Sequence, residues 1–135
     1  LLDKEVEYLQ SYIDLQRLRF GKNMQINTEL QQTSIAYTIE PMLLIPFVEN
    51  AFKHGVGLIE NAQIDINLKV EKEQLFFSVR NKYNDTNTDE PKDKTSGIGL
   101  ANVKRRLNLL YHQDYSLTID KKDGWFTVSL QLKLH

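Results

Sequence analysis

The first 20 residues show the spacing of an amphipathic helix. Apolar side chains recur every three or four positions, which places them on one face of a helix. Gly21 follows this segment, and glycine is a common helix stop. We therefore predict a helix that runs to about Phe20. Its apolar stripe consists of Leu2, Val6, Leu9 and Ile13.

Six short segments instead alternate apolar and polar residues, which is the pattern of a half-buried strand. A turn over residues 71–74, three of which are charged, joins the third and fourth segments, and Asp123-Gly124 joins the last two. Both pairs are therefore predicted to be β-hairpins. The six segments span residues 24–30, 35–39, 64–70, 75–79, 115–119 and 126–134.

Two further segments are predicted to be helices. Pro41 can open the first, over residues 42–54, because proline suits the first helical turn. Pro46 lies inside this segment and should either kink the helix or mark its effective start. The second helix is predicted to begin near Ile98. Its apolar stripe consists of Leu100, Val103, Leu107 and Leu110.

Helices thus alternate with hairpins, which favours an α/β fold class, a two-layer α/β sandwich with helices over one face of a sheet. The length of 135 residues fits one domain. Residues 82–96 are almost wholly polar. Loops of this length in a compact domain are often functional lids, so we predict a lid here.

Composition excludes several classes of protein. Hydrophobic residues make up 41% and charged residues 26%, and the net charge of −1 lacks the basic excess of a nucleic-acid binder. The chain has no cysteine, which excludes disulfides and thiolate metal sites. No apolar run approaches the roughly 18 residues of a membrane span, and no signal peptide is visible. Because the chain begins inside a helical pattern without methionine, we expect a piece of a longer protein.

Three polar side chains with complementary chemistry end the predicted helix 42–54. Asn50, Lys53 and His54 stand at i, i+3 and i+4, so they share one side of the helix. Asn50 offers a hard oxygen that suits Mg²⁺, Lys53 a positive charge for a phosphate, and His54 a donor for a phosphate or sugar oxygen. A solvated polar face at the end of a buried helix would show the same pattern.

A glycine-bracketed turn, Gly97-Ile98-Gly99, precedes the last predicted helix. Glycine lets backbone amides approach a phosphate, and a helix N-terminus favours an anion. A flexible hinge before a helix would have the same sequence. The motif is not a Walker A loop, because no G-K-[ST] follows. It is not a dinucleotide-binding fingerprint either, because a polar loop rather than a strand precedes it.

Two further polar features have plainer interpretations. Asn81 ends a predicted strand just before the polar segment, where a carboxamide can bind a base edge or simply initiate a turn. Arg105 and Arg106 are expected on the solvated side of the last helix.

With both motifs in hand, the chain resembles the ATP-binding domain of the GHKL superfamily. Pro41–Gly55 resembles its N box and Ser96–Leu107 its G2 box, in this order and separated by a hairpin and a lid. Residues 5–20 resemble the linker helix that follows the phosphoacceptor segment. The resemblance covers nearly the whole chain and is strongest to the LytS/YehU-type sensor histidine kinases of bacterial two-component systems.

This resemblance implies a Bergerat-type fold, with a mixed sheet and helices on one face. It implies a linker helix over residues 1–20, after a phosphoacceptor and dimerisation segment that lies outside the chain. Residues 21–135 would be the ATP-binding catalytic domain, and residues 82–96 the ATP lid.

The resemblance also implies ATP and Mg²⁺ as cofactors. Asn50 would hold the metal and, with Lys53, would be catalytic. Backbone amides around residues 97–100 would cradle the triphosphate. The implied ATP-binding residues are Asn50, Lys53, His54, Asn81, Gly97, Ile98, Gly99, Leu100 and Asn102.

The implied activity is transfer of the ATP γ-phosphoryl group to a histidine upstream of this chain, for relay to a response regulator. His54 lies in the N box and does not replace that histidine. The parent is expected to be a homodimeric inner-membrane sensor with this domain in the cytoplasm. No nucleic-acid partner is expected.

Two departures from the family pattern bear on function. The usual G1 box has an aspartate that binds the adenine amino group and then glycines, whereas here Asn81 replaces the aspartate and the glycines are missing. Family members that hydrolyse ATP with water carry a glutamate four residues before the magnesium asparagine. That position is Pro46, which has no proton-accepting side chain to act as a general base. We therefore expect no hydrolysis by water.

Two alternatives share this fold. One is a GHKL serine kinase of the anti-sigma type, which acts on a partner protein. The helix at residues 1–20 counts against it, and a histidine-bearing helix immediately upstream would exclude it. The other is a degenerate domain that only docks to partners, which the missing glycines favour. Nucleotide titration distinguishes that domain from the kinases.

Overall fold

The computed structural model describes residues 1–33, 35–54, 61–82 and 94–135, with backbone only for His54 and residues 94–99. Within these residues the chain forms three α-helices, one short 3-10 helix and five strands. In chain order the elements are α1 (Leu2–Phe20), η1 (Gly21–Asn23), β1 (Met24–Leu30), α2 (Ile45–His54), β2 (Ala62–Glu71), β3 (Gln74–Lys82), α3 (Lys94–Tyr111), β4 (Tyr115–Lys122) and β5 (Trp125–Lys133).

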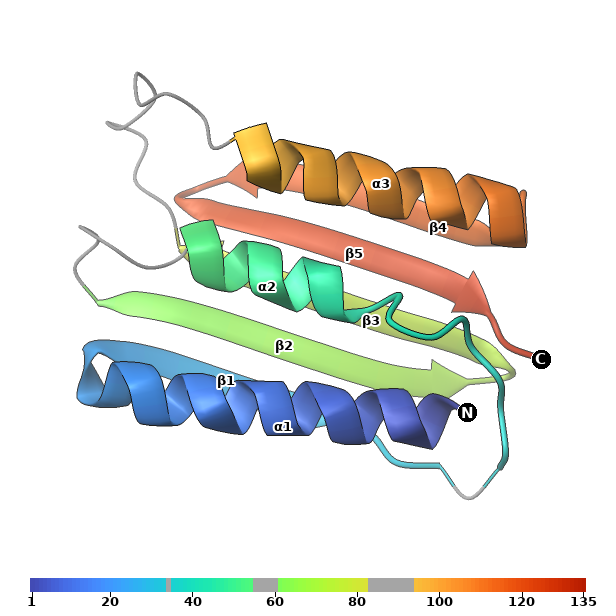
Figure 1. Cartoon of the computed structure of the whole chain (residues 1–135), viewed down its shortest axis with the longest axis horizontal. Coiled ribbons are helices and arrows are strands. Elements are labelled where there is room, and N and C mark those ends of the chain that lie inside the picture. The colour runs from blue at the N-terminus through green and yellow to red at the C-terminus, as the bar shows by residue number, and fades with distance from the viewer. Residues whose placement is uncertain (34, 55–60, 83–93) are drawn as a thin grey trace.

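One five-stranded sheet forms one layer of the molecule, and the helices form the other (Figure 1). The strand order is β1-β2-β3-β5-β4, with β1 parallel to β2 and all other neighbours antiparallel. The three helices α1, α2 and α3 cover the same face of the sheet. This arrangement confirms the predicted two-layer α/β sandwich with a mixed sheet.

Alternation of apolar and polar residues produces both hairpins as predicted. Each hairpin turns through two residues with positive φ. The β2–β3 turn uses Lys72 (51°) and Glu73 (66°). The β4–β5 turn uses Asp123 (55°) and Gly124 (81°). Two consecutive positive φ values are typical of a type I′ turn, whose twist matches that of the strands it joins.

One hydrophobic core fills the space between the layers, and α1 contributes to it. The predicted apolar stripe of α1 is buried in the same cluster as the inner side chains of α2, α3 and the sheet. The ring of Phe52 on α2 lies 5.9 Å from that of Tyr12 and 6.1 Å from that of Phe20, both on α1. Residues 1–20 therefore pack directly on the rest of the chain.

The strand predicted at residues 35–39 is wrong, because the described part of this segment has no regular secondary structure. Its backbone hydrogen bonds are made with two separate segments of the chain instead of with one neighbouring strand. Tyr37 accepts a 3.0 Å hydrogen bond from the Leu2 amide, and the Thr38 amide donates a 2.7 Å bond to the carbonyl of His135. The segment thus ties both chain ends to the domain without forming a ladder.

Helix α2 begins later than predicted, at Ile45 instead of Met42. Pro46 lies in its first turn, where the missing N–H loses no helical hydrogen bond. Pro46 therefore marks the effective start of the helix, which is one of the two outcomes expected for it. Residues 41–44 form a turn in which Met42 has a φ of 60°.

Helix α3 begins earlier than predicted, at Lys94 instead of near Ile98. Val103 and Leu107 are buried and anchor the helix on the sheet. Once a helix is anchored, each further residue adds a hydrogen bond at the modest cost of its own propensity. Glycine costs about 1 kcal/mol at such a position, which is too little to stop the helix.

Both ends of the polar segment predicted as a lid over residues 82–96 belong to regular secondary structure. Lys82 is the last residue of β3, and residues 94–96 belong to α3. The remaining residues, 83–93, lie outside the described part of the chain. Among the described helices, none is both long enough and apolar enough to cross a membrane.

Candidate functional site

Three elements that carry predicted nucleotide-binding residues meet at one end of the sandwich. The last turn of α2, the last residues of β3 and the start of α3 all lie on the left in Figure 1. β3 runs antiparallel to β2, which returns the chain to the side where β2 starts and α2 ends. The fold therefore brings the segments around Asn50, Asn81 and Gly97 to the same end.

Helix α2 buries Asn50 and exposes Lys53. Asn50 is only 6% exposed although it is polar, and it sits among buried apolar neighbours on its helix. A solvated polar face therefore does not describe Asn50, although it fits Lys53. His54 is the last residue of α2, and its side chain lies outside the described residues. The buried neighbours on α2 are Phe47, Val48, Ala51 and Phe52.

Asn81 is a second buried carboxamide at this end. It is 1% exposed and is paired in the ladder with Ile64 on β2 and Phe126 on β5. Its Nδ2 donates a 3.1 Å hydrogen bond to the carbonyl of Lys82. Asn81 therefore lies within β3, with a paired strand on each side. Its side chain shares the face of β3 that the helices cover.

The glycine pair lies inside α3, not before it. Gly97, Ile98 and Gly99 have helical backbone within the first two turns. The first four N–H groups of a helix have no intrahelical acceptor and carry the positive end of its dipole. In α3 these groups belong to residues 94–97. The anion-favouring start of the helix thus stands about one turn earlier than the sequence indicated.

The next predicted residues along α3 have different environments. Leu100 is half-buried and packs against the hydrophobic core. Asn102 is exposed in the third turn of the helix, beyond the start at Lys94. Leu100 therefore anchors the beginning of α3, whereas the Asn102 side chain is available to solvent.

Sequence reasoning missed the role of Arg106. Instead of lying free in solvent, its guanidinium donates hydrogen bonds to the carbonyls of Pro41 (2.8 Å) and Met42 (3.2 Å), just before α2. The same guanidinium lies 3.8 Å from the Glu40 carboxylate. Because these contacts join residues more than 60 positions apart, spacing along α3 carries no signal for them. Arg105, its neighbour, is exposed as predicted.

A tyrosine at the end of α3 completes these contacts. The Tyr111 hydroxyl accepts a 2.9 Å hydrogen bond from the Glu40 amide. Burial raises the pKa of Tyr111 above 10.0, and the carboxylates of Glu40 and Glu5 act in the same direction. Tyr111 is therefore neutral at physiological pH, and its hydroxyl accepts the hydrogen bond from the Glu40 amide.

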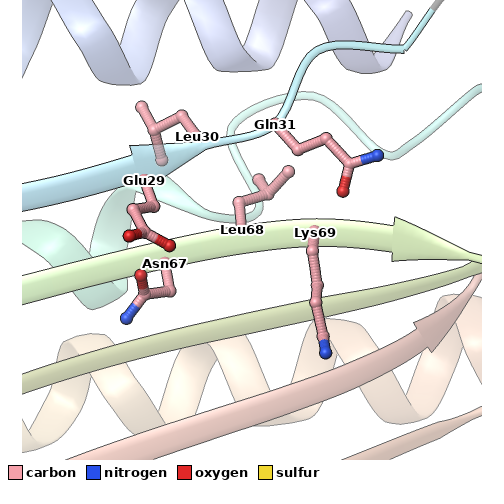
Figure 2. A pocket seen from close by; sticks show the side chains of 6 residues that line it. All are labelled: Glu29, Leu30, Gln31, Asn67, Leu68 and Lys69. Carbon is pink, nitrogen blue, oxygen red and sulfur yellow. The ribbon is translucent and has the colours of Figure 1, made fainter.

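A shallow groove lies at the opposite end of the sheet, between β1 and β2 (Figure 2). Glu29 and Asn67 extend side by side from the paired strands, and the Lys69 chain extends from β2 further along. None of the predicted nucleotide-binding residues lines this groove. Its lining residues are Glu29, Leu30, Gln31, Asn67, Leu68 and Lys69.

Comparison with known sequences gives a consistent result. A sequence model of a family described as the GHKL domain matches residues 42–133. The sensor histidine kinase BtsS of Escherichia coli K12 is 26% identical over 133 residues, 97% of this chain. The sensor protein LytS of Oceanobacillus iheyensis is 27% identical over 90% of this chain. The chain spans only 23% of the length of each of these relatives.

Solved structures share the fold at low sequence identity. The catalytic domain of histidine kinase ThkA, in a nucleotide-free form, has a TM-score of 0.70 and 13% identity, covering 98% of this chain and 91% of that one. Full-length ShkA in complex with AMPPNP has a TM-score of 0.66 and 14% identity, covering 99% of this chain and 30% of that one. The two-layer sandwich is thus the fold of histidine kinase catalytic domains.

Proposed function

The chain belongs to the GHKL domain family, and from this membership we propose that it is the ATP-binding catalytic domain of a two-component sensor histidine kinase. The observation that carries this proposal is the meeting of α2, β3 and the α3 start at one end of the sandwich (Figure 1). Asn50 and Asn81 are both buried there. A helix start beside them favours the phosphates of a nucleotide.

Each part of the site has a distinct task in this proposal. Asn81 binds the adenine edge from the end of β3. Lys53 is exposed at the end of α2, where its ammonium neutralises phosphate charge. The N–H groups at the start of α3 hold the triphosphate. The other nucleotide-contacting residues are His54, Gly97, Ile98, Gly99, Leu100 and Asn102.

Asn50 suits a Mg²⁺ site. Its carboxamide oxygen is a hard, neutral ligand, and a buried position on a packed helix fixes where that oxygen lies. Mg²⁺ keeps several waters and is commonly held by one protein ligand together with substrate phosphates. When bound, the ion neutralises the charge that develops on the transferring phosphoryl group.

Phosphoryl transfer relies on positioning and charge neutralisation more than on covalent chemistry by the protein. Pro46, in the first turn of α2, stands where a water-activating base would lie in an ATPase of this fold. It has no proton acceptor, so we expect transfer to a protein histidine and not to water. The acceptor histidine lies outside this chain, so the isolated chain is expected not to phosphorylate itself.

The rest of the proposal concerns a longer protein, since the relatives are about four times the length of this chain. In that protein, residues 1–20 follow a dimerising segment that bears the acceptor histidine, and residues 21–135 bind ATP. A response regulator receives the phosphoryl group. The parent is a homodimer in the inner membrane, with this domain on the cytoplasmic side.

Titration of the chain with ATP, with and without Mg²⁺, tests the site. We expect binding that depends on Mg²⁺ and that Asn50→Ala abolishes. Asn67→Ala is the matched control, because Asn67 is exposed on the open face of β2. A longer protein with the upstream histidine should then incorporate phosphate from ATP, and Asn50→Ala should prevent this.

The outcomes separate the alternatives. Phosphate label on the isolated chain would contradict the proposal that the acceptor histidine lies elsewhere. Label on a serine of a separate protein would favour the anti-sigma type of kinase. Absence of ATP binding at millimolar concentration would favour a degenerate docking domain, for which the missing glycines after Asn81 are the sequence argument.

A further inference from the structure

The turn before α2 is held by side chains from two other helices. We call residues 40–44 the lead-in turn. Arg106 on α3 donates to the carbonyls of Pro41 (2.8 Å) and Met42 (3.2 Å). Glu5 on α1 accepts a 2.8 Å hydrogen bond from the Met42 amide through Oε1. Both backbone groups of Met42 are therefore bound by charged side chains.

Met42 has a backbone conformation that needs such support. Its φ of 60° lies in the left-handed region, which residues other than glycine rarely adopt. Strained residues of this kind persist where the surrounding structure over-determines them, and they concentrate at functional sites. Here the surrounding structure consists of Glu5 and Arg106, from opposite sides of α2 along the helical layer.

Other polar side chains also gather around the lead-in turn. Arg106 lies 3.8 Å from the Glu40 carboxylate, and the Glu40 amide donates to the Tyr111 hydroxyl. Glu5 is 8% exposed. Among the described residues, its Oε2 is the one buried side-chain nitrogen or oxygen atom without a hydrogen-bond partner. A buried carboxylate without a full set of partners is costly to retain.

We propose that Arg106 is a positioning residue for the nucleotide site, which sets the register of α3 against α2. The proposal rests on the function proposed above. α2 carries Lys53 in its last turn and Asn50 about one turn before its end, and α3 starts at the end of the sandwich where α2 ends (Figure 1). Arg106 joins the two helices at their other ends, near the lead-in turn.

The geometry explains how a remote contact reaches the site. α2 has 10 residues, and a helix rises about 1.5 Å per residue, so it transmits a shift at its start along its whole length as a rigid rod. A fixed start for α2 and a fixed point on α3 together determine where the two far ends lie. Only a planar guanidinium presents two donors in a rigid fork to two successive carbonyls.

The experiment compares Arg106→Gln and Arg106→Lys with Arg105→Gln, which removes the same charge from an exposed position on the same helix. We expect Arg106→Gln to weaken Mg-ATP binding by about two- to thirty-fold, the range for residues that couple to a site without contacting its ligand. Arg106→Lys should lose less, since an ammonium can still bind one carbonyl. Arg105→Gln should bind Mg-ATP as the unaltered chain does.

A stability control separates positioning from general loosening. Val128→Ala removes two methyl groups from the core on β5, at a position that pairs with Val79 and Ile119 and is not part of the lead-in turn. Arg106→Gln should bind Mg-ATP more weakly than Val128→Ala when both are compared at temperatures equally far below their melting points. Equal affinity of the two variants would overturn the proposal.

A nucleotide-free readout keeps the test independent of ATP binding. The side-chain amide signal of Asn50 in a ¹⁵N-labelled sample should shift in Arg106→Gln and stay in place in Arg105→Gln. An unchanged Asn50 signal in Arg106→Gln would refute the positioning role. Failure of the unaltered chain to bind Mg-ATP would instead refute the proposed function, and the Asn50 signal would still decide the role of Arg106.

Discussion

Arg80 donates a 2.7 Å hydrogen bond through Nε to the carboxylate of Asp65, across β3 and β2 on the face of the sheet opposite the helices. Asp65 is buried, and it also accepts hydrogen bonds from the amides of Asn27 (2.8 Å) and Gln63 (3.1 Å). The Arg80 guanidinium lies 4.1 Å from the centre of the Trp125 ring. Four strands are thus connected through one carboxylate and its arginine.

This carboxylate should make stability depend on pH in the acidic range. Burial alone would raise the pKa of Asp65, but its three hydrogen bonds and the Arg80 charge hold the pKa below 3.8. A folded-state pKa below the unfolded-state value gives stability that is fully present above the unfolded-state pKa. That stability is lost as the pH falls through the folded-state pKa.

Asp65→Asn is therefore expected to lower the free energy of unfolding at pH 7 by about 1.5–3 kcal/mol, the range for hydrogen bonds to a charged group. Urea unfolding at pH 7 and at successively lower pH measures the effect. The gap between the variant and the unaltered chain should shrink as the pH falls below 3.8. Asp120→Asn, exposed on β4, is the control. A gap that stayed constant with pH would contradict the assignment.

The alkaline range should report on the contact between α1 and α2. Burial raises the pKa of Tyr12 above 10.0, and the nearby Glu49 carboxylate raises it further. A raised folded-state pKa gives stability that is present below the unfolded-state pKa and is lost as the pH rises through the folded-state pKa. Tyr12→Phe should therefore lose less stability than the unaltered chain above pH 10, as measured by thermal unfolding. An equal loss of stability in Tyr12→Phe and in the unaltered chain above pH 10 would contradict this role of Tyr12.

Packing predicts that the first helix is required for the fold. Leu9 is 0% exposed in the core, whereas Leu15 on the same helix is 63% exposed. Leu9→Ala should lower the free energy of unfolding by about 2–5 kcal/mol, as for other buried leucines. Leu15→Ala should change it by no more than about 0.5 kcal/mol. Equal effects in a urea titration would show that α1 is only a linker and not part of the domain.

The elements that depend on local sequence were predictable. The stripe of α1, the alternation of the hairpin strands and the turn at Asp123-Gly124 each act over a few residues, so spacing and turn chemistry identify them. The strand expected at residues 35–39 failed because its backbone partners, at Leu2 and His135, lie far away in the chain. Periodicity does not say with which segment an extended stretch will pair.

Motifs in the sequence propose the residues of the candidate site, but they do not reveal the contacts that support it. Asn50, Lys53 and Asn81 were identified from motifs, and the fold brings the ends of their elements together. The bonds from Arg106 to the lead-in turn join residues 64 and 65 positions apart. No sequence pattern within α3 distinguishes Arg106 from Arg105. The difference between them arises only when α3 packs beside the lead-in turn.

The glycines of α3 should show opposite effects on stability and on binding. Gly99 has helical backbone in the first two turns of α3. Replacement of a helical glycine by alanine stabilises a helix by about 0.5–1 kcal/mol. Gly99→Ala should therefore raise the melting temperature and weaken ATP binding, because the added methyl group limits how closely the backbone at the start of α3 can approach a phosphate. Unchanged or tighter ATP binding in this variant would show that close approach at Gly99 is not required.

Lys53 and Asn81 should contact different parts of the nucleotide, the phosphates and the base respectively. Lys53 is exposed at the end of α2, where its ammonium can reach only the charged tail in the proposed pose, whereas Asn81 is buried under the helices at the end of β3. Lys53→Gln should weaken ATP binding by about ten-fold, or about 1.4 kcal/mol, and leave adenosine binding unchanged. Asn81→Ala should weaken both ligands alike, since each carries the base. Calorimetric titration measures the affinity of each variant for ATP and for adenosine. Lys69→Gln, on the open face of β2, is the control. Loss of adenosine binding in Lys53→Gln would place the lysine at the base and reverse the proposed orientation of the nucleotide.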